Sequence, residues 1–148
     1  MRIAIGSDHR GFPLKERLKE MLSAQGHDIV DFGTDSAESA DYPDFAIPVA
    51  RKTASSEVDR GIVICGSGIG VSIAANKVVG ARAALVHTVE DARVSRLHNN
   101  ANVLALSEKS LDDPSLEEIV RTWLETEFEG GRHDRRIGKI TGYEKDRR

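Results

Sequence analysis

A single cysteine stands directly before a glycine-rich segment in this 148-residue chain. Cys65 is followed by Gly66-Ser67-Gly68-Ile69-Gly70. If this segment opens a helix, its unpaired amides and the helix dipole favour an anion. A helix N-terminus also raises the thiolate fraction of a cysteine, which could then act as a nucleophile or as a proton acceptor. No cysteine–histidine–asparagine order of a hydrolase is evident and the amides suit an oxyanion, so we favour the proton acceptor.

Two plainer interpretations of the same residues stay open. Cys65 could be an inert core residue, as free cysteines often are, and the glycine segment could be a tight turn that binds nothing. Nucleotide motifs do not fit: a dinucleotide fingerprint needs glycine where Val71 stands, and no Gly-Lys-Ser/Thr triplet occurs. A cysteine phosphatase of the C-x5-R kind would need arginine at that same position.

Three further polar groups could contribute chemistry. Asp8-His9 follows the first apolar run, at a place common for an acid–base or hydroxyl-binding pair. His98-Asn99-Asn100 lies between a helical and an apolar segment, and a plain polar loop is the alternative. Arg132 and Arg136 are four residues apart and share a helix face, so their forked guanidinium groups suit a phosphate.

Composition and spacing exclude several classes of protein. The net charge of −3 leaves no overall nucleic-acid footprint. No apolar run approaches the ~20 residues of a membrane span, and the start lacks a signal-peptide stretch. One cysteine allows no internal disulfide, which fits a reducing cytoplasm. The five histidines show no HExxH or paired Cys/His spacing, so we predict no metal site.

The charge is unevenly distributed. Residues 132–148 hold seven bases and three acids, a net of +4, so residues 1–131 carry 14 bases and 21 acids, a net of −7. A basic tail on an acidic body indicates a local anion site. The alternative is a solvated basic helix.

Apolar patterns place these residues on alternating strands and helices. Short β-rich runs predict five strands, at residues 2–6, 27–32, 61–65, 81–86 and 102–106. The spacing of Leu14, Leu18 and Leu22 predicts a first helix that ends at Gly26. Further helices are expected at about 43–56, 70–79, 89–98, 113–129 and 133–146. In the fifth helix we expect Asp113 as the cap and Pro114 in the first turn, with Gly130-Gly131 ending it.

Five strand–helix units predict an α/β fold with a parallel sheet and helices on both faces. The expected strand order is 2-1-3-4-5, which makes strands one and three neighbours at the topological switch point. Ligands bind there, beyond the carboxyl ends of the strands. Asp8-His9 and Cys65–Gly70 meet at that crevice.

Taken together, the motifs resemble one known family. They are Gly6-Ser7-Asp8-His9, Asp41-Tyr42-Pro43, Ile64 to Gly70, Ala74-Ala75-Asn76-Lys77, Arg96 to Asn102, and Gly130-Gly131-Arg132-His133. Over nearly the whole chain, and in this order, they resemble ribose-5-phosphate isomerase type B, whose family also includes galactose- and allose-6-phosphate isomerases. The length is that of a single domain, over residues 1–148, with 132–148 as an extra basic C-terminal helix. The resemblance implies that this domain is a Rossmann-like three-layer sandwich. It also implies a homodimer or homotetramer, and no metal or other cofactor.

The resemblance also assigns roles. Cys65 corresponds to the base that moves a proton between C1 and C2 of an open-chain sugar phosphate, although some members use a glutamate where this chain has Val71-Ser72. His98 corresponds to the acid that opens the furanose ring. The implied substrate contacts are Asp8, His9, Tyr42, Gly66, Ser67, Gly68, Ile69, Gly70, Asn99, Lys109, Arg132 and Arg136.

Within that set, the Gly66–Gly70 loop corresponds to an anion hole for the enediolate, and Arg132 with Arg136 to the phosphate pair. Lys109 stands where an arginine is usual, so phosphate affinity or sugar preference can differ. We expect ribose 5-phosphate as substrate, with allose or galactose 6-phosphate as the alternative. A nucleotide-linked oxidoreductase and a non-catalytic phosphate-sensing module are the competing classes.

The direction of the helices predicts where His98 lies. Helices run back against the strands, so His98, which ends the fourth helix, should lie near the N-terminal edge of the sheet. Cys65 lies at the other edge, a strand length of ~15–20 Å away. We therefore expect a homodimer in which His98 of one chain completes the Cys65 site of the other.

Overall fold

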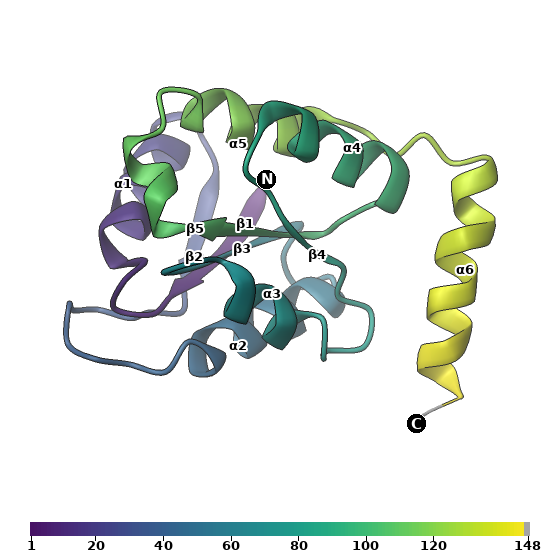
Figure 1. The fold of residues 1–148 in the computed structure, drawn as a ribbon, viewed down its shortest axis with the longest axis horizontal. Coiled ribbons are helices and arrows are strands. Elements are labelled where there is room, and N and C mark those ends of the chain that lie inside the picture. Colours follow the sequence, from purple (N-terminus) through teal and green to yellow (C-terminus); the bar gives the residue numbers. More distant parts are fainter. Residues whose placement is uncertain (147–148) are drawn as a thin grey trace.

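The computed structural model describes residues 1–146 and shows strands alternating with helices (Figure 1). The strands are β1 (Arg2–Ser7), β2 (Asp28–Asp31), β3 (Arg60–Cys65), β4 (Ala83–Leu85) and β5 (Val103–Ser107). The helices are α1 (Phe12–Ala24), α2 (Pro43–Ala54), α3 (Ile69–Ala75), α4 (Val89–Asn99), α5 (Leu116–Glu125) and α6 (Arg132–Lys145), with a short 3-10 helix η1 (Glu108–Asp112) after β5. The predicted α/β class is confirmed.

The five strands form one parallel sheet in the order β2-β1-β3-β5-β4. The predicted neighbours β1 and β3 are confirmed, but the expected order 2-1-3-4-5 is wrong for the last two strands. All five residues of β5 are buried, whereas the three residues of β4 are only half-buried. The longer apolar strand therefore takes the inner position beside β3, and the short strand lies at the edge.

The helices cover the two faces of the sheet unequally. In Figure 1, α1, α4 and α5 lie on one face, and α2 and α3 lie on the other. Parallel strands are joined by right-handed crossovers, so the direction of each step along the sheet selects the face of its helix. The steps β1 to β2 and β4 to β5 go one way, and β2 to β3 and β3 to β4 go the other. At β1 and β3 the chain therefore leaves toward opposite faces, which opens a crevice between their ends.

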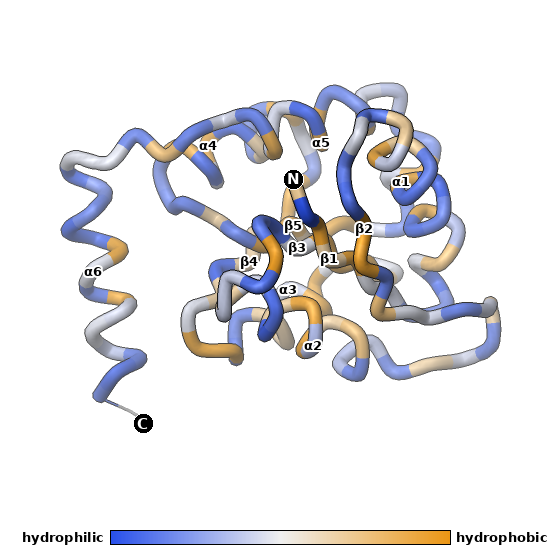
Figure 2. Tube along the Cα trace, turned by 180° about the vertical axis from the view of Figure 1, so that it is seen from behind, coloured by the Kyte–Doolittle hydropathy of each residue, from blue (hydrophilic) through white to orange (hydrophobic). Residues whose placement is uncertain are grey.

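The two faces of the sheet also carry side chains of different size. Large sheet residues meet α1, α4 and α5, among them Ile5, Ile62 and Leu104, and α5 adds the fully buried Trp123 to this cluster. Small residues meet α2 and α3; this second cluster includes Ala4, Val63, Cys65, Val103 and Ala105. In Figure 2 the apolar residues gather in the strands, while α6 is mostly hydrophilic. The small-residue face lets α2 and α3 lie close to the strands, and Cys65 belongs to that face.

Two predicted helices, the third and the fifth, are longer than the observed ones. The α3 helix ends at Ala75 rather than near Val79. The fifth helix begins at Leu116 and ends at Glu125, before Gly130. Asp113 does not cap it directly: its side chain accepts a hydrogen bond from the Ser115 amide at 2.8 Å, which forms a turn ahead of the helix.

The C-terminal helix α6 stands apart from the sheet and its covering helices (Figure 1). Its start is anchored by His133, which is buried. Near its other end, the Glu144 carboxylate accepts a hydrogen bond from the Gly80 amide at 3.2 Å. Between these anchors Ile140 is half exposed. No helix within residues 1–146 combines the length and the apolar character needed to cross a membrane.

The close approach of α2 to β3 generates a stability prediction. A β-carbon at Gly61 would lie 2.6 Å from Thr53 Oγ1 and 2.9 Å from Val49 Cγ1. Gly61→Ala should therefore lower the free energy of unfolding by about 1–3 kcal/mol, measured by urea denaturation. Thr53→Ala removes the closest atom, so the double variant should lose less stability than the two single losses added together. Strictly additive losses would contradict this packing.

Candidate active site

An open cavity of about 630 Å³ lies at the carboxyl ends of the strands. It is placed where β1, β3 and β5 end, since it is lined by residues that directly follow each of them. The lining residues are Asp8, Arg10, Tyr42, Cys65, Gly66, Ser67, Gly70, His87, Ser107, Glu108, Lys109, Ser110 and Asp113. The predicted meeting of Asp8 with the Cys65 loop at the switch point is confirmed.

The loop after β3 holds the thiol in a defined place. The Gly68 amide donates a hydrogen bond to Cys65 Sγ at 3.2 Å, and the cysteine is only 4% exposed. Gly68 has φ 78°, in the left-handed region, and a β-carbon there would lie 2.5 Å from Leu85 Cδ1 and 2.9 Å from the Leu106 carbonyl carbon. Only glycine fits both the conformation and the space. The thiol position therefore depends on the backbone of Gly68.

Neighbouring elements fix the rest of the cavity wall. The buried Asp8 carboxylate accepts hydrogen bonds from the Arg10 and Gly11 amides, both at 3.0 Å, so the turn after β1 orients it. Ser107 Oγ donates to the Gly66 carbonyl at 2.7 Å, which ties the end of β5 to the loop. The Asp8 amide also donates to the Ile64 carbonyl at 3.3 Å, so the ends of β1, β3 and β5 are joined into one polar wall.

Tyr42 closes another side of the cavity. A β-carbon at Gly70 would lie 2.7 Å from Tyr42 Cζ, so the tyrosine ring packs directly on the loop backbone. The ring comes from the residue just before α2, and 39% of Tyr42 is exposed. Tyr42 therefore covers the loop and still faces solvent.

The predicted site residues fall into two groups. Asp8, Tyr42, Cys65, Gly66, Ser67, Gly70 and Lys109 line the cavity. His9 lies one residue beyond Asp8, with its Nδ1 3.2 Å from the Ala40 amide. Gly68 lies at the end of the loop and Ile69 at the first position of α3, and neither lines the cavity in the described chain. The second group, around the end of α4 and the start of α6, contains His98, Asn99, Arg132 and Arg136.

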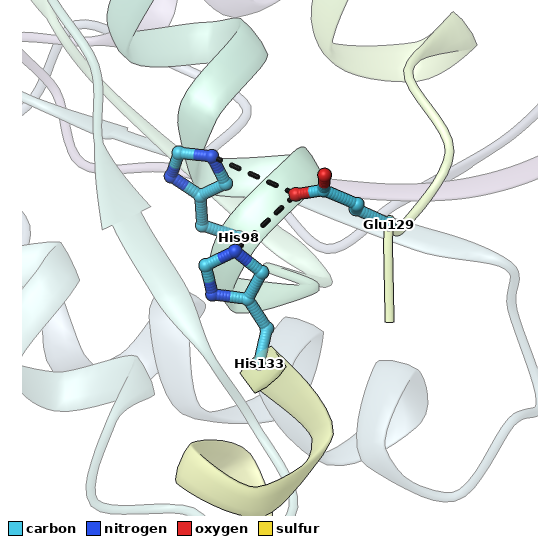
Figure 3. A group of neighbouring side chains, drawn as sticks. All are labelled: His98, Glu129 and His133. Atoms are coloured by element: carbon cyan, nitrogen blue, oxygen red, sulfur yellow. Dashed lines mark ion pairs between the residues drawn. The ribbon is translucent and has the colours of Figure 1, made fainter. Parts of the chain in front are cut away.

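A pair of stacked histidines organises the second group (Figure 3). The rings of His98 and His133 lie 4.5 Å apart with an angle of 16° between their planes. Both face Glu129, whose Oε2 lies 4.0 Å from His98 Nε2 and 3.3 Å from His133 Nε2. Arg136 Nη1 lies 3.5 Å from His133 Nδ1. The structure thus brings His98 together with one of the two predicted phosphate arginines.

The end of α4 is held against the N-terminal edge of the sheet. Asn102 Oδ1 accepts a hydrogen bond from the Arg82 amide at 2.7 Å, and the Gly61 amide donates to the Asn102 carbonyl at 3.0 Å. Arg82 precedes β4 and Gly61 lies near the start of β3. His98, four residues before Asn102, therefore lies at the edge opposite Cys65, as the direction of α4 predicts.

A buried arginine strengthens this end of α4. Arg96 Nη1 donates to the Ala101 carbonyl at 2.6 Å and to Asn100 Oδ1 at 3.0 Å, and its Nε donates to the Thr126 carbonyl at 3.2 Å. Burial lowers the pKa of Arg96 to about 10, and the positive charges of Arg60 and Arg82 add to this. A cation at a helix C-terminus is favourable. Arg96 therefore joins the turn after His98 to the segment after α5.

The histidine group is also the set that could hold a metal ion. The ligand atoms of His98, Glu129 and His133 lie within 4.8 Å of one another, and two histidines with a carboxylate suit Zn²⁺. In stacked rings, however, the nitrogen lone pairs lie in two nearly parallel planes and do not meet, whereas a tetrahedral ion needs them to converge. The arrangement favours the orientation of His98 over the binding of a metal.

Several cavity residues were missed by the sequence reasoning. Arg10, His87, Ser107, Glu108, Ser110 and Asp113 were not predicted as site residues. Most of them follow β5, which the expected strand order had placed away from β3. The continuous apolar run of β5 was the available signal, because a strand buried on both faces belongs in the centre of a sheet.

The geometry of Gly68 generates a prediction about the thiol. Gly68→Ala should displace the loop and increase the rate at which Cys65 reacts with a thiol reagent such as a chromogenic disulfide. Gly26→Ala is the matched control, because Gly26 also has a positive φ, 85°, but nothing lies within 4 Å of its β-carbon position. Both variants carry about 1–2 kcal/mol of backbone strain. Equal thiol reactivity in the two variants would show that the loop does not hold Cys65.

Comparisons with known proteins agree with this architecture. The family model described as Ribose/Galactose Isomerase matches residues 3–140. The ribose-5-phosphate isomerase B of Escherichia coli is 44% identical over 146 residues, which cover 99% of this chain and 98% of the relative. The solved structure of Clostridium thermocellum ribose-5-phosphate isomerase B is 52% identical with a TM-score of 0.96 and covers 100% of both chains.

A third relative was solved with a ligand. The crystal structure of Mycoplasma genitalium ribose-5-phosphate isomerase B has bound ribulose-5-phosphate; it is 47% identical, with a TM-score of 0.91, and covers 98% of this chain and 97% of that one. The family match extends over nearly all of the chain, and both solved relatives share its fold. The chain therefore belongs to the ribose/galactose isomerase family.

Proposed function

We propose that this chain is an aldose–ketose isomerase that interconverts ribose 5-phosphate and ribulose 5-phosphate. The observation that carries the proposal is the position of Cys65 at the end of β3, where its thiol is held by the Gly68 amide beside an open polar cavity. Family membership and the ribulose-5-phosphate complex of the Mycoplasma genitalium relative support the sugar class. Allose 6-phosphate and galactose 6-phosphate are the alternative substrates.

The proposed reaction is a proton transfer between neighbouring carbons. The Cys65 thiolate removes the proton from C2 of the open-chain aldose and, after an enediolate forms, the proton is returned to C1. A positioned base contributes about 10²–10⁴-fold to such a step. The backbone of Gly66–Gly70 is proposed to hold the enediolate oxygens, because amide donors aimed at a developing oxyanion contribute about 3–4 kcal/mol each. This chemistry requires no redox cofactor and no metal.

The other cavity residues are proposed to bind the sugar. Asp8 is held in place by two amides, and His9 follows it on the same turn. Tyr42 lies over the loop, and Lys109 brings a positive charge to the phosphate end. The single cysteine favours a reducing cytoplasm as the place of action.

We further propose that the working unit is a homodimer with shared sites. His98 and Asn99 lie with α6 and outside the cavity wall of their own chain. A second copy would bring His98 to open the ring, Asn99 to contact the sugar, and Arg132 and Arg136 to bind the phosphate. Exposed apolar side chains on and after α3 and on α6 support association of copies: Ile69, Ile73, Val79 and Ile140. A tetramer composed of two such dimers would contain the same shared sites.

The isomerase assignment predicts a preference for one of three sugar phosphates as substrate. Purified protein should convert ribose 5-phosphate faster than allose or galactose 6-phosphate, measured by the appearance of the ketose. Cys65→Ala should lower turnover by at least about 10²–10⁴-fold, since the base is lost. Circular dichroism and urea denaturation check that this variant still folds. Near-normal turnover by the alanine variant would show that Cys65 is not the base. If the wild-type chain binds all three sugar phosphates without turnover, it is a phosphate-sensing module.

The shared site predicts complementation between two inactive variants. Cys65→Ala and His98→Ala chains, unfolded and refolded together, should regain about a quarter of wild-type activity, because half of the dimers are hybrids with one of two sites intact. Each variant refolded alone is the control and should stay inactive. If hybrids form, as a mass tag on one variant would show, and activity does not return, both residues serve the same chain's site.

A further inference from the structure

Arg10 places a guanidinium group in the cavity beside the loop that follows Cys65. It follows β1 by three residues and lines the cavity together with Cys65, Gly66 and Lys109. A β-carbon built on Gly66 would lie 3.4 Å from Arg10 Nε and 3.5 Å from Cζ, so the guanidinium lies over the loop backbone. Its position is therefore within the site and not merely near it.

Glu108 holds this guanidinium in one orientation. Arg10 Nε donates to Glu108 Oε2 at 3.0 Å, and Nη2 donates to Oε1. The pair joins the turn after β1 to the start of η1 after β5, across the end of β3. The hydrogen bond to Glu108 is the main cause of a raised pKa of Arg10, and the same bond lowers the pKa of Glu108. Both groups therefore stay charged over a wide pH range.

The geometry leaves part of the guanidinium available to a ligand. Arginine has five N–H donors, of which Glu108 accepts two. The remaining donors lie on Nη1 and on the second hydrogen of Nη2. Among the described residues that line the cavity, Arg10 is the arginine and Lys109 is the lysine. Arg132 and Arg136 of the same chain lie on α6, which stands apart (Figure 1). A phosphate in this cavity thus meets Arg10 and Lys109 from the chain that supplies Cys65.

We propose that Arg10 binds the phosphate of the sugar substrate and that Glu108 is its positioning residue. The inference rests on the proposed isomerase function and adds a residue to it. Lys109 offers a compact point charge, whereas Arg10 offers two parallel donors that match two phosphate oxygens. Because Glu108 fixes the guanidinium of Arg10, the phosphate binds at one distance from Cys65. Arg10 therefore also contributes to the preference for a sugar phosphate of a particular chain length.

The test separates binding from chemistry. Arg10→Ala should raise KM for ribose 5-phosphate by about 10-fold or more and leave kcat within about 3-fold, because a charge-assisted hydrogen bond to the phosphate, which does not react, is lost. The inhibition constant of inorganic phosphate should rise in parallel. Arg10→Lys should restore only part of the affinity, since the charge returns without the fork.

Arg2→Ala is the matched control. Arg2 lies at the opposite end of β1, and its Nε lies 3.3 Å from Asp28 Oδ2. The Arg2 side chain is 57% exposed and the Arg10 side chain 58%, so the two substitutions remove similar surface ion pairs. Arg2→Ala should leave KM and phosphate inhibition unchanged. If Arg10→Ala behaves like Arg2→Ala in an active enzyme, the phosphate role of Arg10 is refuted.

Glu108→Gln tests the positioning role. It should raise KM less than Arg10→Ala does, and the double variant should be no worse than Arg10→Ala alone, because Glu108 acts through Arg10. Additive effects, or a lower KM in Glu108→Gln, would overturn the role of Glu108. If the wild type turns over none of the three sugar phosphates, the proposed function fails by itself. Calorimetric titration of wild type, Arg10→Ala and Arg2→Ala with inorganic phosphate then decides the Arg10 proposal, with weaker binding to Arg10→Ala alone expected.

Discussion

The close approach of the Gly68 backbone to the end of β5 is the constraint on which the site depends. A side chain at position 68 would collide with Leu85 and with the backbone of Leu106, and the positive φ favours glycine independently. Because the loop can lie this close, the Gly68 amide reaches back to Cys65 Sγ and α3 starts at Ile69. One tight turn thus sets both the thiol and the direction of the helix that follows it.

The sheet supports this turn through the unequal size of its two faces. Ile and Leu side chains with Trp123 fill the space under α1, α4 and α5, whereas Ala, Val and Cys65 leave α2 and α3 close to the strands. Burying large apolar side chains contributes roughly 1.5–3 kcal/mol each, so the first face supplies the larger share of the hydrophobic stabilisation. The second face, with its short side chains, can carry the loop, the thiol and the cavity without a large void beneath them.

The division of the polar residues into two groups follows from helix direction. A helix that connects parallel strands returns to the N-terminal edge, so His98 at the end of α4 lies a strand length of ~15–20 Å from the cavity edge. Arg96, Asn102 and the stacked pair of His98 with His133 fix this second group firmly to its own edge. Small rearrangements within one chain do not bring it to Cys65, which is the physical basis for proposing that copies share a site.

Short-range patterns were enough to predict much of this protein from its sequence. Alternating apolar runs predicted the five strands, and the glycine-rich segment after Cys65 predicted a strand-to-helix turn facing a ligand crevice. The order of β4 and β5, and with it the contribution of Ser107, Glu108 and Ser110 to the cavity, was decided only by the tertiary structure. The Arg10–Glu108 pair joins residues 98 positions apart. Local propensity reports how a segment folds, but which strand lies in the centre depends on the competition of all strands for buried positions, which a single segment does not encode.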